Sequence, residues 1–166
     1  MAILVSTLFL GFGLPALASR VAETTVPPGA ITFGSAAILP APGWTLVEQT
    51  ATSVVLEDKG VWVKFRSVSA QGDSAAVRAQ DLADRMMRQH PTLTAASQPY
   101  SFLTPTGAQG QLIAVAGASS TAIVASVVDG GLAVDVESLG ESTQFGEAIA
   151  DIEDMIESIR LQVPYA

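Results

Sequence analysis

Three runs rich in apolar residues, which together form a central meander, constrain the fold of this chain most strongly. They are Gln111–Gly117, Thr121–Val128 and Leu132–Glu137, and the turn sequence Asp129-Gly130-Gly131 separates the last two. Glycine readily adopts the positive φ angles of a tight hairpin, so this turn predicts antiparallel pairing of the second and third runs. The second run is apolar on both faces, as is typical of a central strand. The sequence therefore predicts an antiparallel sheet with a covering layer on each face.

Further strands are predicted before the meander and at one edge of the sheet. Short runs of apolar and β-branched residues bounded by turn residues occupy Ile31–Phe33, Ala36–Leu39, Trp44–Val47, Ser53–Glu57 and Val61–Arg66. In the last run, apolar residues alternate with Trp62, Lys64 and Arg66, which predicts one buried face. Prolines flank Tyr100–Leu103 and confine that strand to an edge. The rest of residues 92–106 is predicted to be irregular.

Two amphipathic helices are predicted to cover this sheet. The first runs from Ser74 to about Gln89, with Asp73 as its N-cap and small or apolar residues at helical spacing. The second begins near residues 140–143, carries Phe145 and isoleucines at steps of three and four residues, and ends before Pro164. We therefore predict an α+β fold, an antiparallel β-sheet covered by two helices in an α/β/α sandwich, preceded by an N-terminal hydrophobic helix.

The net charge of −8 is concentrated at the C-terminal end of the chain. Residues 1–128 contain equal numbers of acidic and basic residues, so residues 129–166 account for the whole excess of negative charge. A protein with this balance is not expected to bind nucleic acid, because binding to the phosphate backbone requires a basic surface. The charge distribution instead predicts an acidic surface on the second helix.

The N-terminal segment Ala2–Ala18 contains no charged residue and is dominated by large apolar side chains. As a helix it would span roughly 25 Å, the short end of what a bilayer core requires, which fits a transmembrane anchor. The alternative is a secretory signal peptide cleaved after Ala18, although no basic residue precedes the apolar run. We expect residues 1–18 to be the anchor or signal peptide, 19–30 a linker and 31–166 a single α/β domain outside the cytoplasm. Of the two, the single-pass anchor in the cell membrane is favoured over secretion.

The sequence contains few of the residues and motifs that are typical of catalytic sites. It has no cysteine, which excludes disulfides, thiolate catalysis and cysteine-ligated metal sites. The single histidine, His90, is predicted to end the first helix, and no serine lies in a Gly-x-Ser-x-Gly motif. Residues 107–110 lack the lysine of a phosphate-binding loop. We therefore predict a protein that is not an enzyme, with no catalytic residue, no cofactor and no metal site.

The order of the elements resembles that of the PsbP-like α/β/α sandwiches. The resemblance rests on the segment Leu39-Pro40-Ala41-Pro42-Gly43-Trp44, the mid-chain helix, the meander and a closing helix that includes residues 156–161. The resemblance covers roughly Ile31 to Leu161. Within this group, the chain is similar in particular to small membrane-anchored actinobacterial proteins. The resemblance implies a fold used for binding or assembly, as in extrinsic photosystem subunits, a Ran-binding import factor and envelope assembly proteins. It implies no catalytic motif at these positions.

Together these observations predict a membrane-associated protein that binds an unidentified protein partner, such as a membrane complex of the cell envelope. The candidate partner surface consists of Glu147, Asp151, Asp154 and Glu157, whose charge would attract a basic partner, and of Trp62. For Trp62, the alternative is a position under a helix. A second hypothesis for the whole protein is a carrier of an apolar envelope ligand such as a lipid, held near Leu82, Met86 and Met87. A hydrolase is the least supported alternative.

Overall fold

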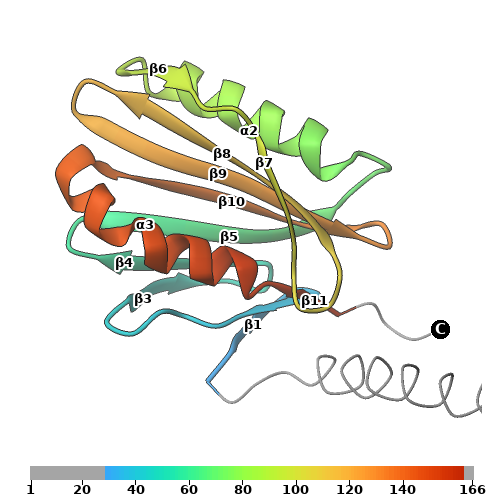
Figure 1. Ribbon diagram of the computed structural model, residues 1–166. Coiled ribbons are helices and arrows are strands. Elements are labelled where there is room, and N and C mark those ends of the chain that lie inside the picture. Colours follow the sequence, from blue (N-terminus) through green and yellow to red (C-terminus); the bar gives the residue numbers. More distant parts are fainter. Residues whose placement is uncertain (1–28, 163–166) are drawn as a thin grey trace, which may run out of the picture.

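A computed structural model of the protein describes residues 29–162. Within this range the main sheet has eight strands in the order β3-β4-β5-β10-β9-β8-β6, and β7 also pairs with β8 (Figure 1). The strands are β3 (Thr45–Gln49), β4 (Ser53–Asp58), β5 (Val61–Ser69), β6 (Leu93–Ala96), β7 (Tyr100–Leu103), β8 (Gln109–Gly117), β9 (Ser120–Asp129) and β10 (Leu132–Glu141). All the paired neighbours run antiparallel.

The central meander forms the middle of this sheet as β8, β9 and β10, which confirms the predicted antiparallel pairing. Asp129 pairs with Leu132, so the β9–β10 hairpin turns over Gly130 and Gly131 alone. Both glycines have positive φ angles, 54° and 85°, as such a two-residue turn requires. The middle of β9 is buried on both faces, in agreement with its apolar sequence.

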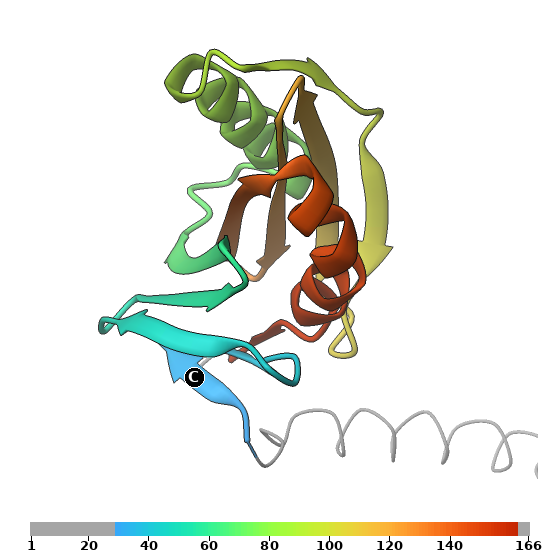
Figure 2. The ribbon, with the colours of Figure 1, turned by 90° about the vertical axis from the view of Figure 1, so that its left-hand side faces the viewer.

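Helices α2 (Ala75–Gln89) and α3 (Ser142–Glu157) lie on opposite faces of the sheet (Figure 2). Neighbouring residues of β9 point alternately to the two helices: Val124 packs in the cluster under α2, whereas Ile123 and Ala125 pack in the cluster under α3. This alternation is the ordinary geometry of a strand. The predicted covering of the sheet by two helices is therefore confirmed, whereas the predicted N-terminal helix lies outside the described residues.

The predicted ends of both helices need correction. Ser74, not Asp73, is the N-cap of α2, because its hydroxyl accepts a hydrogen bond from the Val77 N–H at 3.3 Å. Helix α3 ends at Glu157 and does not continue toward Pro164. The Ser158 hydroxyl donates to the carbonyl oxygen of Met155 at 2.7 Å, a local bond that competes with further helical turns.

A second sheet of three strands joins the two ends of the described chain. It consists of β1 (Ile31–Phe33), β2 (Ala36–Ile38) and β11 (Arg160–Leu161) in the order β1-β2-β11. The sequence predicted the first two strands but assigned Arg160 and Leu161 to a helix, which is wrong. Pairing with Ala36 and Ala37 favours the extended conformation here.

Strand β6 was missed, because residues 92–106 were expected to be irregular outside the edge strand. Its pairing with β8 is interrupted by a register shift between Leu93 and Ala95, and only Leu93 of its four residues is buried. A strand this short and exposed has neither an apolar run nor a clean alternation to reveal it. The predicted edge strand Tyr100–Leu103 is confirmed as β7.

No helix within residues 29–162 combines the length and the apolar composition needed to cross a bilayer. The candidate anchor, residues 1–18, lies outside the described residues, as does almost all of the expected linker, residues 19–30.

Candidate functional site

The four acidic residues predicted as a partner surface lie on α3, whose opposite face is fixed in the core. Phe145, Ile152 and Ile156 of this helix are completely buried against the sheet. Glu147, Asp151 and Asp154 follow one another at steps of four and three residues, so they form one stripe along the outer side. Three of the four side chains are exposed, and Asp151 is half-buried. The acidic face is therefore presented by a helix that the core holds rigidly.

Asp151 differs from its neighbours because it also anchors the loop before β3. Its carboxylate oxygen Oδ2 accepts a hydrogen bond from the indole Nε1 of Trp44 at 3.1 Å. Trp44 is only 9% exposed and packs in the core under α3. This carboxylate therefore stabilises the domain in addition to any role at the surface.

The remaining acidic groups of the helix have few partners within the described residues. Glu147 lies 3.9 Å from Lys59, and both side chains are about 70% exposed, so this pair contributes little to stability. The carboxylates of Glu153, Asp154 and Glu157 form no hydrogen bond or ion pair with residues 29–162. All three side chains are exposed in the described part of the chain.

Trp62 does not lie on this surface. It is on β5, on the face of the sheet that α2 covers, and packs against the α2 cluster together with Met87 and Leu139. The structure therefore separates the fifth predicted site residue from the four acids by the thickness of the sheet. The position beside a helix, which was the alternative from the sequence, is the one observed.

A groove between β7 and α3 was not predicted from the sequence. It has a volume of about 200 Å³, with apolar walls formed by Tyr100, Phe102, Leu112 and Ile156 and with Glu153 and Glu157 at its edge. The available signal was the alternation of aromatic residues in β7 between two prolines. Strand β7 and α3 come together only through tertiary packing, which cannot be predicted from a local sequence pattern.

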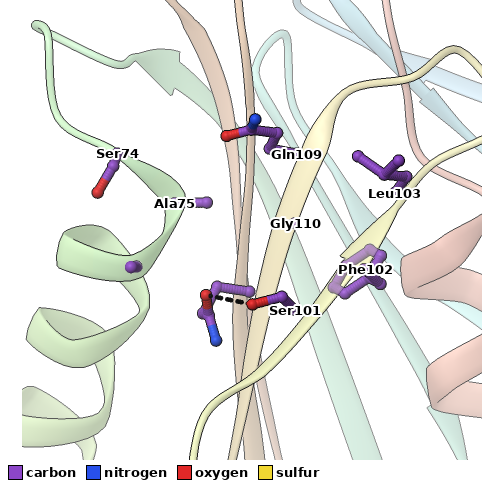
Figure 3. A pocket seen from close by; sticks show the side chains of 9 residues that line it. Ser74, Ala75, Ser101, Phe102, Leu103, Gln109 and Gly110 are labelled. Atoms are coloured by element: carbon purple, nitrogen blue, oxygen red, sulfur yellow. Dashed lines mark hydrogen bonds between the residues drawn. The ribbon is translucent and has the colours of Figure 1, made fainter.

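A second, more open groove lies on the other side of β7, against the first turn of α2 (Figure 3). Its volume is about 580 Å³, and it contains no charged residue. The residues that line it are Ser74, Ala75, Ala76, Ser101, Phe102, Leu103, Gln109, Gly110 and Gln111. On the sheet side of this groove, the Ser101 hydroxyl of β7 donates a hydrogen bond of 3.1 Å to Oε1 of Gln111, its paired neighbour on β8.

Between α2 and the sheet lies a nearly buried ion pair. Asp135 is 4% exposed, and the guanidinium of Arg78 binds its carboxylate with two hydrogen bonds, Nε to Oδ1 at 3.1 Å and Nη2 to Oδ2 at 2.7 Å. The hydroxyl of Ser126 donates to the same carboxylate at 3.0 Å, and Arg66 approaches it to 3.8 Å. Glu137, two residues along the same face, lies 3.8 Å from Arg85 of α2. These two carboxylates thus connect α2 to the sheet.

The residues proposed to hold an apolar ligand belong to the core cluster under α2 or pack against it. Leu82 and Met86 are 1% and 2% exposed and pack against Ile113, Val115 and Val124. Neither of the two grooves described above is lined by Leu82, Met86 or Met87.

Residues 29–162 contain no group of three or more histidine, aspartate or glutamate side chains arranged to hold a metal ion. His90 is the C-cap residue of α2, at the position expected from the sequence. No buried side-chain polar atom in the described part of the chain lacks a hydrogen-bond partner. The features that distinguish this surface are therefore the acidic face of α3 and the two grooves beside β7.

No protein-family model matches the sequence, and no curated protein matches it either. Solved structures with a similar fold include cyanobacterial PsbP (CyanoP) from Synechocystis sp. PCC 6803, with a TM-score of 0.56 and 9% identity over 76% of this chain and 86% of that one. The Ran-binding protein Mog1p of Saccharomyces cerevisiae has a TM-score of 0.50 and 10% identity over 76% of this chain and 90% of that one. A mutant of protein Mog1 has a TM-score of 0.52 and 10% identity over 81% of this chain and 96% of that one. At such identities the likeness shows the fold alone, and it confirms the expected PsbP-like architecture.

Proposed function

We propose that this protein is a membrane-associated, extracytoplasmic binding module that docks a basic region of a partner protein on the outer face of α3 and catalyses no reaction. The observation that carries the proposal is the set of exposed carboxylates, Glu153, Asp154 and Glu157, that no described residue neutralises. They stand on a helix whose inner face is completely buried, so a partner would meet a preformed surface.

The physical role of this surface is to accelerate and orient the encounter. Clustered charge of one sign raises the association rate with an oppositely charged partner and adds less to affinity. Exposed charges are screened within about 10 Å at 0.1 M salt, so the association rate is expected to fall as salt is added.

Two further observations support parts of the proposal. One of the proteins with a similar fold is described as Ran-binding, which makes protein recognition a known use of this architecture. The membrane location rests on the uncharged apolar segment Ala2–Ala18 and on the resemblance to small membrane-anchored actinobacterial proteins. The partner is accordingly sought in the membrane fraction.

Crosslinking in intact cells, followed by affinity purification of the full chain from membranes, tests the proposal. The variant Glu147→Gln/Asp154→Asn/Glu157→Gln removes three charges from α3 and is expected to lose a specific crosslinked partner. Its matched control, Glu48→Gln/Glu57→Gln/Asp81→Asn, changes the net charge equally at exposed positions outside α3 and is expected to retain that partner. Recovery of no specific partner with the unmodified chain, or equal recovery with both variants, would overturn the proposal.

A further inference from the structure

Among residues 29–162, strand β7 lies at an edge of the sheet, and no strand pairs with its outer side. Within the described residues it pairs only with β8, in a continuous register from Tyr100–Leu112 to Leu103–Gln109. Every second residue of an antiparallel strand directs its N–H and C=O groups away from its partner, so β7 offers free hydrogen-bonding groups over roughly 13 Å. Tyr100 and Leu103 are 60% and 67% exposed, which makes this edge apolar as well as unpaired.

On the α3 side, β7 borders a groove with apolar walls and an acidic edge. Tyr100 and Phe102 point to this side, because they pair with Leu112 and Gly110 and contribute to the groove toward α3. Glu153 and Glu157 are one helical turn apart, about 6 Å of rise, while alternate side chains of a strand are separated by about 7 Å. Two basic side chains on one face of an added strand would therefore match the spacing of the two carboxylates.

On the α2 side, β7 borders the open, uncharged groove (Figure 3). Leu103 and Ser101 line it from β7, and Ala75 and Ala76 line it from α2. Side chains on the other face of an added strand would enter this space, where small apolar groups fit and charged groups would have no counter-charge.

We propose that the free edge of β7 accepts an extended segment of the partner as an additional strand, with basic side chains facing Glu153 and Glu157 and apolar side chains facing the groove beside α2. The main-chain hydrogen bonds would supply affinity, and the two grooves would select an alternating basic–apolar sequence. This inference rests on the proposed function and specifies how the partner binds.

The charges of the chain argue against a second copy of this protein as the occupant. Residues 100–103 carry no charge, so pairing of two β7 strands would leave Glu153 and Glu157 of both copies without basic partners. The opposite edge of the sheet is less suited to strand addition, since the pairing of β3 with β4 has a register shift between Leu46 and Glu48. Such irregularities protect edges from pairing.

Binding of a fluorescently labelled peptide, Ac-Arg-Val-Arg-Val-Arg-Val-amide, to the full chain in neutral detergent tests this inference by fluorescence anisotropy. We expect saturable binding that the scrambled peptide Ac-Arg-Arg-Arg-Val-Val-Val-amide does not show. The variant Glu153→Gln/Glu157→Gln should weaken binding about fivefold, because it removes two partly solvated ion pairs. The matched variant Glu48→Gln/Asp81→Asn removes two charges at exposed positions outside α3 and outside both grooves, and it should change affinity less than about twofold.

Two N-methylated peptides distinguish strand addition from simple charge attraction. Methylation of the arginine nitrogens and methylation of the valine nitrogens block opposite edges of an extended peptide. One of these peptides should bind as the unmodified peptide does, and the other should bind at least about tenfold more weakly. Equal binding of both methylated peptides and the unmodified one, equal binding of the scrambled peptide, or equal effects of the two protein variants would overturn the inference. So would self-association of the free protein that Leu103→Arg abolishes, because the edge would then belong to a second copy.

The outcomes for the two proposals can be told apart. A partner that is crosslinked in cells and lost from the three-charge α3 variant, but equally recovered with Glu153→Gln/Glu157→Gln, would refute strand addition and leave the acidic-face proposal standing. Failure to recover any specific partner would refute the proposed function, whatever the peptide does.

Discussion

The two helical layers of this domain are attached to the same sheet by different means. Under α3 the contact is made by large side chains, with Phe145 and Ile152 completely buried. Under α2 the buried residues include Ala79 and Ala83, and Arg78 reaches the sheet to bind the nearly buried Asp135. Large apolar side chains hold α3, whereas α2 combines the buried Leu82 and Met86 with a bidentate ion pair to the sheet. Because the contact of α3 with the sheet is mainly apolar, most of its acidic side chains have no role in attaching the helix, and Asp151 is the exception through its hydrogen bond with Trp44.

The largest expected effect of a single substitution is in the α3 layer. Ile152→Ala should lower the free energy of unfolding by about 3–4 kcal/mol, because it removes buried methyl groups and leaves a cavity at a site that is completely buried. Chemical denaturation followed by the fluorescence of the two tryptophans measures this change. A loss below about 1 kcal/mol would mean that volume does not hold this layer.

In the α2 layer, Asp135→Asn should lower the free energy of unfolding by about 2–3 kcal/mol, because the mostly buried Arg78 then keeps only the half-exposed Asp73, 3.9 Å away, as a charged partner. The double variant Arg78→Met/Asp135→Leu should lose less than this single variant, since no buried charge remains unpaired. The same denaturation experiment on both variants tests this order. A double variant less stable than Asp135→Asn would contradict a positioning role for the ion pair.

The N-termini of the two helices differ in side-chain capping, and the expected difference in stability is smaller. Ser74→Ala should destabilise the protein by about 1 kcal/mol, because the Val77 N–H loses its hydrogen bond to the Ser74 hydroxyl. Glu141, at the equivalent position of α3, makes no side-chain capping bond, so Glu141→Ala should have a clearly smaller effect. Equal losses of stability for the two variants would show that the cap in α2 contributes nothing specific.

The smallest effect is expected at the outer face of α3. Lys59→Ala should change the free energy of unfolding by less than about 0.3 kcal/mol, because Lys59 and Glu147 are both largely exposed and 3.9 Å apart. Differential scanning calorimetry of this variant beside the unmodified protein provides the measurement. A larger loss would mean that Glu147, like Asp151, has a structural role within the domain.

The spacing of residues along the chain was sufficient to predict the helices and the tight hairpin of the fold. The spacing of apolar residues in α3 and the Gly130–Gly131 turn identify the helix and the hairpin, because their causes lie within a few residues. Strand β11 could not be predicted, since two residues become extended only by pairing with Ala36 and Ala37 at the other end of the domain. At Arg160 and Leu161, the helical spacing of the preceding isoleucines was a stronger signal than any pattern typical of a strand.

In the candidate site, too, the features set by local sequence could be predicted, whereas those set by tertiary packing could not. The acidic residues of α3 could be predicted as one exposed stripe, because helical spacing alone places them together. The groove beside β7 could not, as it requires Tyr100 and Glu153 to meet through tertiary packing. The ion pair of Arg78 with Asp135 likewise joins a helix to a distant strand, and the sequence showed only an acid on one face of an alternating strand.

The pairing of β2 with β11 has a consequence for the order in which the protein is made. Ala36 emerges from the ribosome well before Leu161, its partner, which lies beyond α3 in the chain. The β1–β2 hairpin must therefore wait for nearly the whole domain before its second neighbour arrives, and such distant contacts form late because loop closure is entropically unfavourable. A nascent chain that stops short of Arg160 would lack β11 and leave this small sheet with β1 and β2 alone.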